Sequence, residues 1–389
     1  MTESLWVNAI LFVIGAAAIW WAGTRLEHYA DLIARRFHLG HAFVGVLLLA
    51  AATSLPELAT TITAVLLLDN PTLAVHNLLG GVALQTGLLI IADAATRRPG
   101  SLTFFSPRFV LLIQGLGVVF LLQLTVAGLT ARGAPVLFSF SAWLVALLAG
   151  WISLMYVVYR WRGHPRWTPT HTDDVPEELL QDDPPEPDED ESVPDRRVGL
   201  GFAAMSVMVL AGGWLATQSA DVLAEQSGLG SAFLGATFLA AATSMPELST
   251  TIAAVRGDRY TVAVSNIFGS NLFDVTLLVL AELLYRGGTI LDRTDPSLIF
   301  VAVIAALMTC VYLWGLMERD NKTIAGIGWD SALALVIYVG GMTVLYLAPW
   351  GSSGSAGAAY REPRAAGCAA TAEHGYDWGV RHEQTGLCA

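Results

Sequence analysis

Charged residues are scarce in this chain of 389 residues, and lysine is almost missing. Only 14 % of the residues are charged, and Lys322 is the single lysine beside 20 arginines. Hydrophobic residues make up 54 %, a share that is typical of integral membrane proteins and unusual for soluble domains. The formal charge of −12 excludes the basic surface that binding to nucleic acid requires.

Cysteine is also rare, with three residues in the chain, and the first residues of the chain include no arginine or lysine. Cys310 falls in a predicted helix, whereas Cys368 and Cys388 lie in the tail, where they either pair or stay as two free thiols. The first residues, MTESLW, lack the basic region of a cleaved signal peptide. We therefore expect the first apolar window to be retained as a helix.

Apolar windows fill most of the chain. A helix of roughly 20 apolar residues spans a bilayer. The sequence therefore predicts an all-α integral membrane protein with about ten transmembrane helices. The windows are 5–24, 42–66, 72–92, 104–126, 134–158, 198–218, 232–254, 261–281, 297–317 and 329–349.

Composition divides the chain into four segments. Residues 160–197 contain DDVPEELLQDDPPEPDEDESVPD, an acidic and proline-rich stretch that cannot bury apolar area and is expected to be a solvated linker. Residues 1–159 and 198–350 hold five windows each, and 351–389 form a tail rich in glycine, alanine and serine that is expected to be flexible. The linker lacks the EF-hand loop pattern.

Arginine and lysine predict the orientation of the helices in the cell membrane, because cytoplasmic loops carry an excess of them. With ten alternating helices, the loops on the linker side hold 15 of these residues and the other side holds 6. We expect the acidic linker in the cytoplasm and both termini outside.

The two halves of the chain repeat each other. LGHAFVGVLLLAAATSLPELATTITAV (39–65) aligns with LGSAFLGATFLAAATSMPELSTTIAAV (229–255), and 19 of the 27 positions are identical. HNLLGGVALQTGLLIIAD (76–93) then aligns with SNIFGSNLFDVTLLVLAE (265–282). Because each half holds an odd number of spans, the second copy enters the membrane from the opposite side. The sequence predicts a 5+5 inverted-topology repeat, an architecture of secondary transporters.

Acids and prolines stand in the middle of the matched windows. Glu57 and Glu247 correspond between the copies, and Asp274 lies in the eighth window. An ionised carboxylate at the bilayer centre costs roughly 2.5–3.5 kcal/mol, so we expect these acids to face a cavity and to bind a cation or take up protons. Pro56 and Pro246 are expected to break their helices and free backbone carbonyls. An oxygen-only site suits Ca²⁺ or Na⁺.

Polar side chains follow these acids at helical spacing. Residues at i, i+4 and i+8 share a helix face, so four polar stripes are expected to enclose one cavity. Ser54 and Ser244 stand directly before the predicted breaks. The stripes are Thr53, Glu57 and Thr61; Thr243, Glu247 and Thr251; Asn77, Gly81 and Gln85; and Asn266, Ser270 and Asp274.

Two matched pairs have alternative interpretations. Asn77 and Asn266 are either cation ligands or bridges between helices. Asp93 and Glu282 are either acids on an entry path or ordinary helix-end acids.

The motifs TSLPEL and TSMPEL, each followed by NLLGG or NIFGSNLFD, resemble the two alpha repeats of the sodium/calcium exchanger family, within the cation/calcium antiporters. The resemblance covers about 39–95 and 229–285. It implies Ca²⁺ extrusion driven by Na⁺ entry, with the first and sixth helices sliding past the other helices. The implied ligands are, for Ca²⁺, Glu57, Glu247, Asp274 and the backbone oxygens of Thr53 and Thr243, and, for Na⁺, Ser244, Ser270 and the carbonyls of Ala50 and Ala240.

The first copy departs from the family pattern. Gly81 lacks the hydroxyl that would serve one sodium site, and Gln85 stands where asparagine or aspartate is usual. Proton-coupled Ca²⁺ antiport therefore stays open beside Na⁺/Ca²⁺ exchange, and a cation channel is the alternative from another class. No enzymatic activity and no cofactor are expected. The expected partners are Ca²⁺, Na⁺ or H⁺ as transported ions, and the lipid bilayer.

Overall fold

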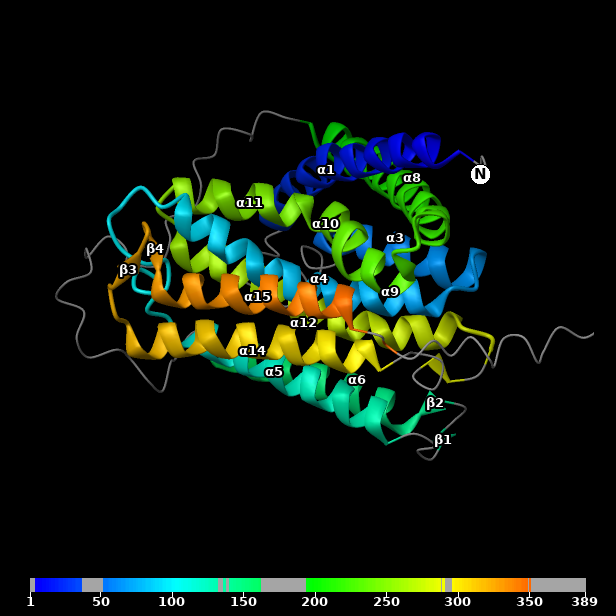
Figure 1. Ribbon diagram of the computed structural model, residues 1–389. Coiled ribbons are helices and arrows are strands. Elements are labelled where there is room, and N and C mark those ends of the chain that lie inside the picture. Colours follow the sequence, from blue (N-terminus) through cyan, green and yellow to red (C-terminus); the bar gives the residue numbers. More distant parts are fainter. Residues whose placement is uncertain are drawn as a thin grey trace, which may run out of the picture. The chain divides into compact units, whose positions relative to one another are not determined.

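The computed structural model describes residues 4–36, 52–131, 136–137, 140–161, 194–287, 289–290, 296–348 and 350 (Figure 1). All of these belong to one compact unit, Met1–Gly351. The predictions for Ala50, for the linker residues 162–193, and for Cys368 and Cys388 lie outside the described residues.

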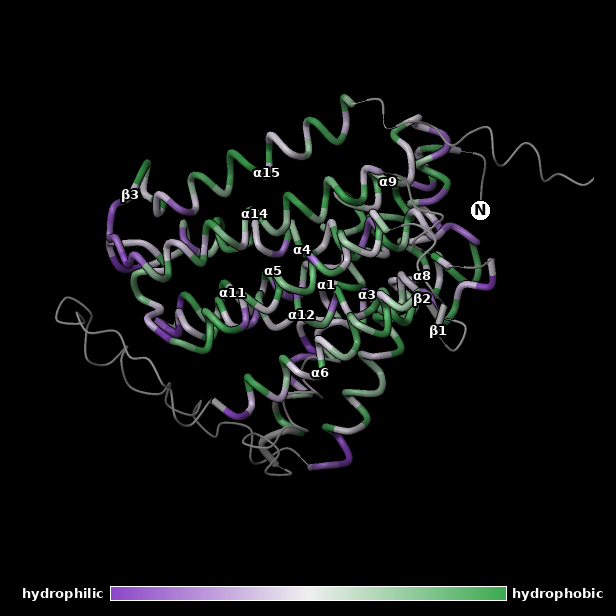
Figure 2. The backbone as a smooth tube through the Cα atoms, turned by 90° about the horizontal axis from the view of Figure 1, so that it is seen from below, coloured by the Kyte–Doolittle hydropathy of each residue, from purple (hydrophilic) through white to green (hydrophobic). Residues whose placement is uncertain are grey.

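Eight of the described helices are long and apolar enough to cross a membrane. In Figure 2, hydrophobic residues run along these helices and hydrophilic ones gather at the connections. The described part is therefore all-helical, apart from two short antiparallel ladders, β1 (Val136–Leu137) with β2 (Phe140–Ser141) and β3 (Thr323–Ile324) with β4 (Ile327–Gly328). The eight helices are α1 (Leu5–Arg36), α4 (Pro71–Ala94), α5 (Phe109–Thr130), α6 (Ala142–Trp161), α8 (Asp195–Ser227), α12 (Tyr260–Leu284), α14 (Ser297–Glu318) and α15 (Trp329–Leu347).

The two remaining predicted windows, 42–66 and 232–254, differ from the other eight. The first window ends in the shorter apolar helix Leu55–Leu67, and the second begins in the shorter apolar helix Gly230–Thr243. Both windows are interrupted where the proline follows, because proline cannot donate the next helical hydrogen bond. The pieces are α3 (Leu55–Ile62) and the π-helix η1 (Thr63–Leu67) in the first half, and α9 (Gly230–Leu234), the π-helix η2 (Gly235–Leu239), α10 (Ala240–Thr243) and α11 (Met245–Arg256) in the second.

Helices α1 and α8 pack against each other and contact α11 and α3, respectively, whereas α4 packs against α12, α14 and α15 (Figure 1). A Cβ atom on Gly15 would lie 2.8 Å from the backbone nitrogen of Ala216 and 2.9 Å from the carbonyl oxygen of Gly212, so the two backbones touch. In α4, 78 % of the apolar window is buried, against 22 % in both α1 and α8. α4 is therefore enclosed, whereas α1 and α8 form an outer pair.

The matched acids Asp93 and Glu282 anchor the loops that follow their helices. The Asp93 carboxylate accepts backbone hydrogen bonds from Leu102 at 2.7 Å and from Gly328 at 2.6 Å. The Glu282 carboxylate accepts one from the backbone of Ile290 at 2.6 Å. These contacts favour the helix-end interpretation over an entry path.

Helix α4 crosses the π-helix η2 at very short range. A methyl group on Gly80 would overlap the backbone of Ala236, and one on Gly235 would lie 2.9 Å from the carbonyl oxygen of Leu73. The counterpart of Gly80 in the second half, Gly269, has no neighbour within 4 Å among the described residues, which do not include the first-half segment that corresponds to η2. Close packing against η2 therefore requires glycine at position 80.

The variants Gly80→Ala and Gly340→Ala form a test and its control. Gly80→Ala is expected to destabilise the protein by about 1–3 kcal/mol, because the added methyl group overpacks the crossing. Gly340, which is exposed on α15 with no neighbour within 4 Å among the described residues, is the control. Gly340→Ala is expected to leave stability unchanged or to raise it by up to about 1 kcal/mol, because alanine favours the helix. Thermal unfolding of the detergent-purified variants, followed by size-exclusion chromatography, measures both. Equal effects would contradict the described crossing.

Candidate cation-binding site

The two predicted helix breaks are confirmed, and they have nearly the same geometry. Ser54 has φ −89° and ψ 15°, and Ser244 has φ −88° and ψ 9°. Pro56 and Pro246 lie in the first turn of α3 and α11, where a missing N–H costs no intrahelical hydrogen bond. The carbonyl four residues before each proline loses its helical donor.

Each break places a glutamate in the first turn of the following helix, Glu57 in α3 and Glu247 in α11. Both residues are fully buried, and none of their carboxylate oxygens has a hydrogen-bond partner. The positive end of the helix dipole favours a carboxylate there by roughly 0.3–1 kcal/mol. Because the burial of an unpaired charge costs much more, the pair is arranged to receive positive charge.

The buried acids are close enough to repel one another. Glu57 and Asp274 both act electrostatically on Glu247, and Asp274 acts on Glu57. Among the described residues, no three acidic, histidine or cysteine side chains converge on one metal-sized point. A Ca²⁺ ion takes six to eight oxygens at roughly 2.3–2.6 Å, so hydroxyl and carbonyl oxygens would have to complete its shell.

An asparagine–threonine bond clamps the break in each half. Asn77 Nδ2 donates to Thr60 Oγ1 at 2.9 Å, and Asn266 Nδ2 donates to Thr250 Oγ1 at 3.1 Å. The two threonine hydroxyls contact the backbone carbonyls of Glu57 and Glu247 at 3.0 and 3.2 Å. These contacts bear out the interpretation of both asparagines as bridges between helices.

Gln85 and Asp274 correspond between the two copies, and they contact each other. Gln85 Nε2 donates to Asp274 Oδ2 at 2.8 Å. Next to this bond, Asn271 Nδ2 donates to Thr86 Oγ1 at 3.0 Å. Counterparts can touch only where the two copies meet, so the contact between α4 and α12 lies at the junction of the repeat. The amide uses one carboxylate oxygen of Asp274 and leaves Oδ1 unpaired.

The predicted serine and threonine ligands are all buried, from the breaks to α12. The hydroxyls of Ser54 and Ser244 have no hydrogen-bond partner, and Ser54 is the polar neighbour of Asp274. Thr53 is 4 % exposed and Ser270 is 3 % exposed. The structure therefore brings hydroxyl oxygens to the same buried region as the acids.

The carbonyl of Ala240 is already engaged within its own half. It accepts from the backbone nitrogen of Ser244 at 3.0 Å and from Thr243 Oγ1 at 3.2 Å. Thr243 is in turn the polar neighbour of the Glu57 carboxylate. A sodium ion that uses the Ala240 oxygen would have to share it with these two donors.

Among the described residues of this region, the buried side-chain atoms without a hydrogen-bond partner are all oxygens. They come from the two breaks and from α3, α4, α11 and α12, and each of them can accept a hydrogen bond or bind a hard cation. They are Ser54 Oγ, Glu57 Oε1 and Oε2, Thr61 Oγ1, Asn77 Oδ1, Gln85 Oε1, Ser244 Oγ, Glu247 Oε1 and Oε2, Asn271 Oδ1 and Asp274 Oδ1.

A fourth acid, Glu27 on α1, faces the same region, and the sequence analysis did not include it. The residue is 6 % exposed, its Oε1 has no hydrogen-bond partner, and it acts electrostatically on both Glu57 and Glu247. The predicted window 5–24 ended before Arg25, whereas α1 continues to Arg36. The sequence feature that could have identified Glu27 is an acidic residue shortly after an apolar window, in a helix that continues beyond the window.

The clamps predict matched effects on stability. Asn77→Ala and Asn266→Ala should each destabilise the protein by about 1–3 kcal/mol, because each leaves a threonine hydroxyl without its donor. Thr343→Val is the control, because the Thr343 hydroxyl is exposed and bonds only its own helix. Thermal unfolding in detergent measures all three variants. If only one of the two asparagine variants lost thermal stability, the two breaks would not be stabilised in the same way.

Comparisons with known proteins include a relative found by sequence and two solved structures of similar fold. The inner membrane protein YrbG of Escherichia coli strain K12 is 28 % identical over 302 residues, which cover 77 % of this chain and 87 % of that protein. The crystal structure of the H⁺/Ca²⁺ exchanger CAX has a TM-score of 0.60 at 11 % identity, with 87 % and 81 % of the two chains covered. The sodium-calcium exchanger NCX_Mj has a TM-score of 0.54 at 17 % identity, with 87 % and 99 % covered.

The sequence profile described as "Sodium/calcium exchanger protein" matches residues 7–169 and 198–347, which lie in both halves of the chain. The two solved structures share the fold at low identity. The chain belongs to the sodium/calcium exchanger family of membrane cation antiporters.

Proposed function

We propose that this protein extrudes Ca²⁺ in exchange for Na⁺ at the site between the two helix breaks. The observation that carries the proposal is the pair Glu57 and Glu247, fully buried at corresponding positions with all carboxylate oxygens unpaired. One Ca²⁺ or several Na⁺ ions would neutralise the same carboxylates. Because Ca²⁺ and Na⁺ compete for these oxygens, the site holds one kind of ion at a time. Transport of one ion in one direction is therefore coupled to transport of the other in the opposite direction.

The contacts between the halves support a 5+5 inverted repeat with alternating access. Gly23 packs against the ring of Pro246, and its counterpart Gly213 packs against Ala59 in the first turns of α3. α1 thus contacts the break of the second half, and α8 contacts the break of the first. An outer pair that touches both breaks can slide past them and expose the site to one side at a time.

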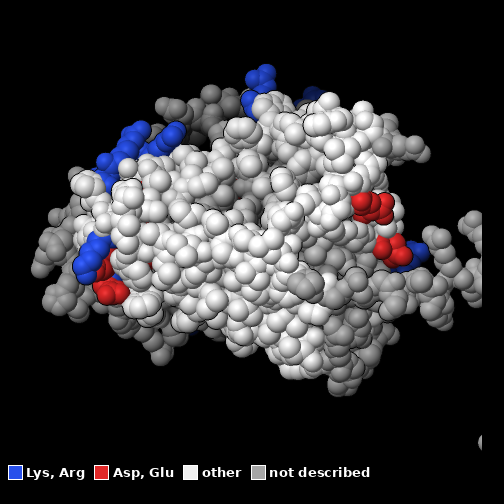
Figure 3. Space-filling view, viewed as in Figure 1, with Lys and Arg blue, Asp and Glu red and all other residues white. Residues whose placement is uncertain are grey.

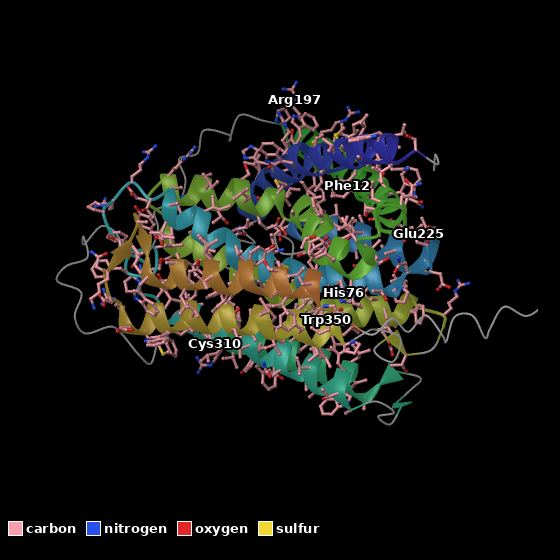
Figure 4. All side chains as sticks on the ribbon, viewed as in Figure 1. Phe12, His76, Arg197, Glu225, Cys310 and Trp350 are labelled. Carbon is pink, nitrogen blue, oxygen red and sulfur yellow. The ribbon has the colours of Figure 1, made fainter. Side chains whose placement is uncertain are left out.

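Charge placement supports a cell-membrane location with the acidic linker in the cytoplasm. On the face in Figure 3, cationic side chains gather near the ends of α11 and α14 and the start of α8, and the surface between the ends is uncharged. Arg197 and Glu225 mark opposite ends of α8 (Figure 4). The positive end would be cytoplasmic, which places both termini outside.

Proton coupling is the second candidate, and particular residues favour it. Gly81 provides no hydroxyl, the Gln85 amide nitrogen occupies Asp274 Oδ2, and the Ala240 carbonyl already accepts two hydrogen bonds. Each of these reduces the oxygens available to Na⁺. A cluster of buried carboxylates can exchange protons for Ca²⁺ instead.

The variants Glu57→Gln and Glu247→Gln should each abolish Ca²⁺ transport, because an amide keeps the shape but removes the charge that binds the ion. ⁴⁵Ca uptake into proteoliposomes measures this loss, and equal reconstitution is checked on gels. Glu225→Gln, exposed at the end of α8, is the control and should transport normally. Normal uptake by either site variant would refute the proposed site.

The coupling ion is tested in the same vesicles. Vesicles loaded with Na⁺ and diluted into Na⁺-free buffer should take up ⁴⁵Ca, whereas an imposed pH gradient should have no effect. Uptake driven by the pH gradient and abolished by a protonophore would instead establish proton coupling. Uptake that neither saturates nor needs a counter-ion would identify a channel.

A further inference from the structure

Glu27 lies against the break of the second half at a defined register. Gly23, one helical turn earlier on α1, packs against the ring of Pro246. One turn later on both helices, Glu27 has the Thr250 hydroxyl as its polar neighbour. α1 and α11 therefore run side by side here, and the Glu27 carboxylate is held on the side of the site that α1 covers.

The corresponding residue of the outer helix α8 is not an acid. Thr217 stands at the position of Glu27, is fully buried, and donates its hydroxyl to the carbonyl of Gly213 at 2.7 Å. Thr217 is thereby satisfied within its own helix, whereas Glu27 Oε1 is buried without a hydrogen-bond partner. At this pair of corresponding positions, only α1 carries an acid.

Burial of an acid that has one neutral hydroxyl beside it and no positively charged partner among the described residues needs a cause. The acids around Glu27 repel it, since it acts electrostatically on both Glu57 and Glu247. A divalent cation between those two glutamates cancels their charge and removes this repulsion, and a cation within reach of the Glu27 carboxylate attracts it directly. The packing of α1 against α11 is then favoured when the site is loaded and opposed when it is empty.

We propose that Glu27 is a further cation-binding carboxylate, contributed by α1, that ties the position of this outer helix to the charge held by Glu57 and Glu247. The inference rests on the proposed function, because it requires a cation at the central site. It assigns to one side chain the link between ion occupancy and helix movement that strict exchange requires.

The test compares Glu27→Gln with Thr217→Val, its matched control in the other half. Purified full-length variants are examined by ⁴⁵Ca equilibrium dialysis in detergent and by ⁴⁵Ca exchange in proteoliposomes. Glu27→Gln should weaken Ca²⁺ binding and raise the KM for Ca²⁺ about tenfold, with the maximal rate falling less than twofold. Glu27→Asp, which keeps the charge, should stay within about threefold of the wild type. Thr217→Val should match the wild type.

The possible results distinguish failure of the inference about Glu27 from failure of the proposed function. A wild-type Ca²⁺ affinity in Glu27→Gln would overturn the inference while leaving the central site intact. If Glu27→Gln does not fold, Glu27→Asp decides the matter, because a large loss of maximal rate at unchanged KM would show a purely structural role. Failure of the wild-type protein to bind Ca²⁺ at all would instead refute the proposed function.

Discussion

The rest of the structure depends on carboxylates that are buried at the first turns of two broken helices. Glu57 and Glu247 have no hydrogen-bond partners for their charged oxygens, and the helix dipoles repay only a small part of the cost of burying them. The prolines place these side chains, and the asparagine–threonine clamps hold the broken backbone. The proposed cation site accounts for this burial, because a bound cation would neutralise the carboxylates.

The two halves share the frame of the site and differ in its lining. The breaks at Ser54 and Ser244 have matching backbone angles, and the clamps use corresponding residues. Around this frame, Glu27 has a neutral counterpart, and Gln85 corresponds to an acid. The matching breaks suit a site that opens to either side of the membrane. The side chains that differ between the halves, such as Glu27 and Gln85, would determine which ions the site can bind.

The sequence was sufficient for what depends on local chemistry. Proline next to glutamate within an apolar window predicted both breaks and both buried acids. It was insufficient where tertiary packing decides. Window 104–126 began too early, because Phe104 and Phe105 belong to a turn that is buried in the core before α5 begins at Phe109. Apolar composition does not distinguish a buried turn from a span. Glu27 was missed because its environment comes from α11, far along the chain.

The bond between Gln85 and Asp274 shows what an exact repeat could not provide. These two residues occupy the same place in the two copies and lie against each other. Two halves of identical sequence would set like against like at this place, either two acids that repel or two amides with less charge to offer. Because the two halves differ here, an amide on one side steadies an acid on the other.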